Sequence, residues 1–137
     1  MRGAAVQVSS SAISFTVDDV PASSKFLATH FGFRERMAAD GFASLGREDG
    51  AVDVVFLRRG IEVLPDWLRD RRADGTILAF VIDDLDGEER RLRAEGVEIA
   101  LPIREEPWGE RLFMVTDPNG VIYELVEWVQ PTVVPAR

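Results

Sequence analysis

Carboxylates are the main chemically active side chains of this 137-residue sequence, which has 24 aspartate and glutamate residues, one histidine and no cysteine. There is no cysteine, which excludes thiolate nucleophiles, disulfides and cysteine-based metal sites. The single histidine, His30, falls near the end of an expected helix, where an imidazole is usually a surface or helix-end group. Candidates for a binding site are several aromatic side chains and the carboxylate of Glu124, which lies within the apolar run Val121–Val126.

Glu124 lies within an apolar run that reads as a strand, and its role stays open. In a cleft, its carboxylate could bind a cationic or N–H-rich group, or act as a base with a raised pKa. Alternatively, it could be paired with an arginine such as Arg58 or Arg111. The sequence shows no acid partner beside it.

Among the aromatic residues, Trp108 is the one we expect to contact a ligand. It falls in a loop between two expected strands, residues 102–110, where a large apolar side chain has little core to fill. Aromatic residues at strand positions, including Phe56 and Trp128, are open to a second interpretation as core or dimer contacts. Aromatic walls would suit planar ligands, since stacking contributes on the order of 1 kcal/mol per pair.

The elements that must position these residues follow from an internal repeat. The run Ser14–Val20 resembles Ala79–Leu85, because in each an apolar stretch leads into two aspartates and an aliphatic residue. Asp49-Gly50 and Asn119-Gly120 each precede a second apolar run and are strong hairpin signals. The chain therefore predicts two tandem βαβββ modules, an α+β fold whose sheets form a concave cleft.

The expected boundaries place all 137 residues in one domain. Module one covers about 12–58 and module two about 76–128, with a linker at 59–75 and a tail at 129–137. Helices should follow the aspartate pairs, which supply N-cap oxygens, and end at Gly32 and Gly96. Strands are expected at 12–17, 33–37, 41–47 and 51–58, and again at 76–82, 97–103, 110–116 and 120–128.

These features resemble the vicinal oxygen chelate superfamily, which includes glyoxalase I, bleomycin-resistance proteins, fosfomycin-resistance enzymes and extradiol dioxygenases. The most specific piece is the segment Trp108–Val126, with its Trp-Gly start, Asp-Pro-Asn-Gly turn and terminal Glu-Leu. The segment Lys25–Phe33 is similar to the family's first helix and its Gly-aromatic end, although Leu27 stands where a tyrosine is common.

The resemblance implies four strand positions that hold a divalent metal in the enzymes of this superfamily. They map to Ala12, Val54, Ile77 and Glu124, and only the last carries a donor atom. A divalent ion needs several nitrogen or oxygen ligands. On this resemblance we expect no metal, no cofactor and no catalytic residue, and the chain is closest in character to metal-free antibiotic-binding members.

Strand alternation from these positions sorts the side chains that would line the cleft. Counting from Val54 places Phe56 and Arg58 in the cleft, and counting from Ala12 places Ser14 and Thr16 there, with Phe15 under the helix. The full set of predicted ligand-binding residues is Ser14, Thr16, Phe56, Arg58, Trp108, Phe113, Glu124 and Trp128.

The composition of the chain limits the classes of binding partner that we expect. The net charge of −8 disfavours nucleic acid and would favour a cationic ligand, although it could also serve only solubility. No apolar run approaches the ~20 residues of a membrane helix, and no secretory signal is visible, so we expect a cytoplasmic protein.

Three functions remain open. The first is sequestration of an antibiotic, such as a bleomycin-type glycopeptide, a mitomycin-type quinone or a quinoline or quinoxaline peptide. The second is a glyoxalase-like lyase, isomerase or other enzyme that uses a cleft carboxylate without metal. The third is a structural or regulatory module without a small ligand. The resemblance also implies a homodimer, in which whole modules could exchange about the linker Arg59–Gly75.

Overall fold

The computed structural model describes residues 5–129 and contains two βαβββ modules in tandem. The first module consists of β1 (Ala12–Val17), α1 (Val20–Phe31), β2 (Arg34–Ala39), β3 (Phe42–Gly46) and β4 (Asp53–Arg58). A connection that includes the short helix α2 (Asp66–Arg69) leads to the second. That module consists of β5 (Ile77–Val81), α3 (Leu85–Ala94), β6 (Glu98–Glu105), β7 (Glu110–Thr116) and β8 (Ile122–Trp128). The α+β fold of two tandem modules predicted from the repeat is confirmed.

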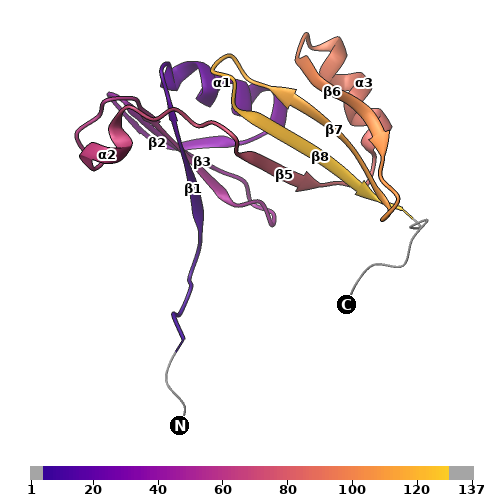
Figure 1. Cartoon of the computed structure of the whole chain (residues 1–137), viewed down its shortest axis with the longest axis horizontal. Helices are drawn as coiled ribbons and strands as arrows, with labels where there is room; N and C mark the ends of the chain where they lie inside the picture. Colours follow the sequence, from indigo (N-terminus) through magenta and orange to yellow (C-terminus); the bar gives the residue numbers. More distant parts are fainter. Residues whose placement is uncertain (1–4, 130–137) are drawn as a thin grey trace.

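Each module forms a four-stranded mixed sheet with the same strand order. The orders are β1-β4-β3-β2 and β5-β8-β7-β6, with the first strand of each module parallel to the last. Because β1 and β5 each pair with one neighbour, both are edge strands of their sheets. Figure 1 shows the two sheets set at an angle to each other, with α1 above their junction and α3 over the second sheet.

Both long helices begin where the sequence predicts, and α1 ends at Gly32 as expected, whereas α3 ends at Ala94, two residues before the predicted Gly96. The Asp19 carboxylate accepts a hydrogen bond from the Ala22 amide at 3.2 Å, which caps the first turn of α1. Asp84 does the same for the Gly87 amide at 3.0 Å in α3. Gly32 ends α1 with a φ of 68°, a left-handed conformation that suits glycine.

Helix α1 packs against both modules and joins them into one core. Its Phe26 ring stacks on Tyr123 of β8, with ring centroids 5.7 Å apart, and Phe31 lies 5.5 Å from Phe80 of β5. Phe15 of β1 also reaches Tyr123 from the first sheet. The helix-facing sides of the two sheets therefore share one apolar core, and the opposite side of each sheet, its open face, points away from α1.

In residues 5–129, no helix has the length and hydrophobicity needed to cross a bilayer.

Candidate functional site

Glu124 and Trp128 lie on the open face of the second sheet. Strand register places Glu124 between Ala79 of β5 and Met114 of β7, while Trp128 is opposite Glu110. Side chains alternate along β8, so Tyr123 and Leu125 point into the core and Glu124 points away from it. We call the surface formed by Ala79, Trp108, Glu110, Glu124 and Trp128 the Glu124 face.

The electrostatic environment of Glu124 favours its protonated form. Partial burial raises the pKa of its carboxyl, the nearby negative charge of Glu110 raises it further, and Arg104 opposes both effects. Neither of the arginines considered as partners neutralises it. Arg58 pairs with Asp40 at 3.0 Å, and Arg111 pairs with Asp86 at 3.0 Å.

Two tryptophans flank Glu110 on the same face. The indole Nε1 of Trp108 donates a hydrogen bond to Glu110 Oε1 at 2.9 Å, which fixes the ring beside the carboxylate. Trp128, the cross-strand neighbour of Glu110, is 56% exposed, and Trp108 is 46% exposed. Large aromatic surface open to solvent beside carboxylates can stack on flat rings and attract cations.

Glu110, which belongs to this arrangement, is not among the residues predicted from the sequence. Its signal was present, because an acidic residue two positions after a loop tryptophan can turn back to the indole N–H once the strand begins. Trp108 lies in the short loop between β6 and β7, so its indole N–H can reach the carboxylate of Glu110 at the start of β7.

Two residues predicted to line the cleft, Phe56 and Phe113, lie in the core instead. Phe56 pairs in register with Phe15, and the two rings lie 6.1 Å apart within the core. Phe113 is paired with Leu125 and is also fully buried. The predicted orientation of β4 was one residue out of phase, which places Phe56 in the core, and Phe113 lies on the core side of β7 opposite Leu125. Neither phenylalanine therefore offers surface to a ligand in this chain.

The other predicted residues lie in the first module. Ser14 and Thr16 are on the open face of the first sheet, beside Val55 and Leu57 of β4. Arg58, at the end of β4, lines a separate cavity of about 650 Å³ together with Asp40. Within one chain, the predicted site residues therefore fall on the Glu124 face, on the first sheet and in the core, and only Trp108, Glu124 and Trp128 come together.

The single histidine lies at the junction of the helices. His30 Nδ1 is 2.7 Å from Glu95 Oε1 at the end of α3, and its ring packs edge-on against Phe26. The imidazole belongs to α1 and not to the Glu124 face.

Comparison with known proteins identifies the family. The model of the glyoxalase/bleomycin resistance protein/dioxygenase superfamily matches residues 10–125, which is most of the chain. The chain belongs to this superfamily. No curated protein sequence matches it significantly.

Several solved structures share the fold at low sequence identity. A glyoxalase/bleomycin resistance protein/dioxygenase from Nocardioides aligns with a TM-score of 0.73 at 21% identity, covering 98% of this chain and 91% of its own. TioX from Micromonospora sp. ML1 aligns with a TM-score of 0.67 at 24% identity, covering 89% of this chain and 100% of its own. A lactoylglutathione lyase from Agrobacterium tumefaciens aligns with a TM-score of 0.68 at 18% identity, covering 85% and 91%. These similarities support the fold and leave the activity open.

The superfamily's metal positions do not fit a divalent cation in this chain. Val54 is fully buried and points into the core, which corrects its predicted orientation, and Val55 takes its place on the open face beside Ser14. Like Ala12 and Ile77, Val55 carries no donor atom, so Glu124 is the one donor of the set. In residues 5–129 no three histidine or carboxylate side chains gather as metal ligands would.

Proposed function

We propose that this protein is a metal-independent, cytoplasmic small-molecule-binding protein that sequesters a planar, cationic antibiotic. The observation that carries the proposal is the Glu124 face, where the exposed rings of Trp108 and Trp128 stand beside the carboxylates of Glu110 and Glu124.

The physical support comes from two properties of that face. Each ring of a bound planar molecule that stacks on a tryptophan would gain on the order of 1 kcal/mol beyond the burial of its area. A positive charge near the indoles would gain from cation–π attraction and from the two carboxylates. It would also relieve the repulsion between Glu110 and Glu124 that raises the pKa of Glu124.

Several antibiotics combine these features, and the superfamily's description includes bleomycin resistance proteins. A bleomycin-type glycopeptide offers a flat ring system with a cationic tail. Quinoline or quinoxaline peptides offer flat chromophores, and mitomycin-type quinones offer a smaller planar core. Among these, cationic and ring-bearing compounds match the Glu124 face best.

A homodimer would complete the binding site. The open faces of the two sheets in one chain point away from α1, so a cleft with two walls needs a second chain against the Glu124 face. The edge strand β5 exposes Ile77 and Val81, at 49% and 67%, which are apolar side chains that association would bury. The connection Arg59–Gly75 is the hinge at which the chain could exchange modules with its partner.

Titration of tryptophan fluorescence with bleomycin, mitomycin C and a quinoxaline peptide tests the proposal. We expect saturable quenching with at least one planar compound, and a loss of affinity of at least tenfold in Trp108→Ala, because the stacking surface beside Glu110 is removed. The matched control is Trp67→Phe in α2, which removes an exposed indole remote from the Glu124 face. The proposal is wrong if no compound gives a saturable response, or if Trp67→Phe lowers the affinity as much as Trp108→Ala. The former outcome would favour a structural or regulatory module.

A second candidate function is a metal-independent enzyme with Glu124 as general base. The raised pKa of this carboxyl favours it, because a base works best when its pKa lies nearer to neutrality. The two candidates are separated by Glu124→Gln: an enzyme would lose turnover and keep substrate binding, whereas a sequestering protein would show no product with the wild type.

A further inference from the structure

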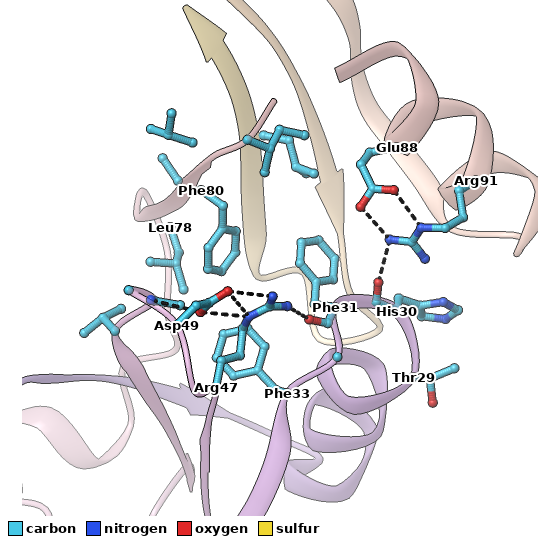
Figure 2. Close-up of a pocket in the computed structure, with 18 residues that line it drawn as sticks. Thr29, His30, Phe31, Phe33, Arg47, Asp49, Leu78, Phe80, Glu88 and Arg91 are labelled. Atoms are coloured by element: carbon cyan, nitrogen blue, oxygen red, sulfur yellow. Dashed lines mark hydrogen bonds and ion pairs between the residues drawn. The ribbon is translucent and has the colours of Figure 1, made fainter. Parts of the chain in front are cut away.

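A cavity of about 890 Å³ lies where the two modules meet, away from the Glu124 face. Its walls come from the last turn of α1, the loop of residues 47–52 between β3 and β4, strand β5 and helix α3. Figure 2 shows the aromatic rings of Phe31, Phe33 and Phe80 around the Arg47–Asp49 pair. The Arg47 guanidinium lies 5.9 Å from the centroid of the Phe33 ring. This volume is in the range of small-molecule sites, about 300–1,000 Å³.

The apolar part of the cavity is a cluster of three phenylalanines. Phe80 lies 5.5 Å from Phe31 and 5.9 Å from Phe33, measured between ring centroids. Phe31 and Phe80 are only partly buried, so they keep ring surface available on the cavity side. A flat ring placed there would find aromatic partners from both modules.

Two arginines form the polar rim, and both are already fixed. Arg47 pairs with Asp49 at 2.7 Å and donates to the carbonyl of Phe31. Arg91 pairs with Glu88 at 2.8 Å and donates to the carbonyl of His30 at 2.9 Å. Figure 2 shows the Arg47–Asp49 pair beside the phenylalanine rings and the Glu88–Arg91 pair apart from it. The two guanidinium groups thereby cap the last carbonyls of α1.

The charged side chains of this rim are already paired, which favours an uncharged ligand. Arg47 is matched by Asp49, and Arg91 is matched by both Glu88 and Glu95, at 2.8 and 3.1 Å. Glu95 also contacts His30 Nδ1. A charged ligand would have to displace one of these partners and lose solvation without a free counter-ion. A neutral ligand leaves both pairs intact and gains from the apolar floor.

We propose that this intermodular cavity is a second binding site, for an uncharged, flat aromatic molecule. The site is independent of the proposed antibiotic site, because it shares only Ala79 with the Glu124 face and contains neither tryptophan of that face. Since its walls come from both modules, an occupant would also hold the modules together.

The test uses two fluorescent probes built on one scaffold. N-phenyl-1-naphthylamine is neutral, and 8-anilinonaphthalene-1-sulfonate adds a single negative charge. We expect the neutral probe to bind the full chain saturably, with one site per chain and an affinity at least tenfold higher than that of the sulfonate. Equal or tighter binding of the sulfonate would overturn the assignment, because it would mean that the guanidinium groups are available to an anion.

The variant Gly50→Trp tests whether the neutral probe binds in the cavity. Gly50 lines the cavity, and a Cβ built on it meets no atom within 4 Å, so a large side chain fits without strain at the backbone. This variant should weaken the neutral probe at least tenfold, whereas Trp108→Ala on the Glu124 face should leave it unchanged. The reverse pattern would overturn the proposal.

If Gly50→Trp proves unstable, amide NMR of the wild-type chain gives the same decision. On adding the neutral probe, the signals of Gly32 and Gly50 should shift, and that of Gly109, in the loop before β7, should not. Shifts confined to Gly109 would place the probe on the Glu124 face and contradict the second site.

Discussion

The buried side chain of Asp117 accepts hydrogen bonds from four different residues. It is buried and accepts hydrogen bonds from Ser23 Oγ at 2.6 Å and Tyr123 Oη at 3.1 Å. It also accepts from the amides of Asn119 at 2.8 Å and Val121 at 3.0 Å. A residue of the β7–β8 turn thus joins α1 of the first module to the core of the second.

Asp117→Ala should destabilise the protein by about 3 kcal/mol, because it leaves buried donors on both modules without an acceptor. Chemical denaturation measures this change. The control is Asp40→Ala, which removes an exposed carboxylate paired with Arg58 and should cost under about 0.5 kcal/mol. Equal midpoints for the two variants would contradict the role of Asp117.

The raised pKa of Glu124 predicts how ligand binding depends on pH. Burial and the charge of Glu110 favour the protonated carboxyl, so on acidification the charge that attracts a cation is lost at a higher pH than in an ordinary glutamate, whose pKa is 4.5. We expect the affinity for a cationic ligand to fall as the pH is lowered through this raised pKa, and the dependence to disappear in Glu124→Gln. Binding titrations at a series of pH values measure it.

The same group predicts the sign of a stability effect. Because the folded-state pKa of Glu124 lies above its unfolded value, the folded chain holds the proton more tightly. The contribution of Glu124 to stability is therefore greatest below the unfolded pKa and declines as the pH rises through the folded one. A stability profile that is the same in wild type and Glu124→Gln across this window would show that the carboxyl is not perturbed.

At the scale of elements, the free edge of β5 is the feature with the clearest consequence. Its outward side chain Val81 is 67% exposed on a strand that pairs only with β8. If a second chain covers the Glu124 face, Val81→Glu should shift the protein from dimer to monomer, because a buried, unpaired charge opposes association. Sedimentation velocity measures the shift.

Val63→Glu is the matched control, since Val63 is 72% exposed in the connection between the modules. It should leave the dimer intact. A protein that is monomeric before any substitution, or a dimer that Val81→Glu leaves unchanged, would contradict the proposed association.

The elements themselves were predictable because each rests on a local signal. Aspartate caps, glycine ends and the Asp-Gly and Asn-Gly turns mark helices and hairpins without reference to the rest of the chain. The orientation of β4 was not predictable in this way. Val54, Val55, Phe56 and Leu57 are all apolar, so no alternation distinguishes the two faces. The pairing of Phe56 with Phe15 decides the phase, and that contact is not local in sequence.

The candidate sites also differ in whether a local sequence signal could reveal them. Trp108 and Glu124 could be found because a loop tryptophan and a strand carboxylate are unusual where they stand. The cavity between the modules could not, because Arg47, Arg91 and Phe80 are ordinary residues of a loop, a helix and a strand. They converge only because α1 packs against both sheets.

For the whole molecule, the shared position of α1 implies that the modules unfold together. Phe26 of α1 contacts Tyr123 of β8, while the hydrogen bonds of Asp117 and Asn119 hold the start of the same helix. Each long helix packs on the sheet of its own module, and the side chains of α1 add contacts to β5 and β8 of the second module. We therefore expect the two modules to unfold as one cooperative unit, although each half contains a complete set of strands.

Phe26→Ala tests this cooperativity, because it removes a ring from module one and reports in module two. We expect a loss of about 3 kcal/mol, typical of a large-to-small change in a core. In a Trp67→Phe background, fluorescence comes from Trp108 and Trp128 of the second module. Its denaturation midpoint should fall as far as the midpoint seen by circular dichroism of the whole chain. A fluorescence transition that stays in place while circular dichroism divides into two steps would mean that the modules are independent, and that the contacts of α1 with Tyr123 do not couple them.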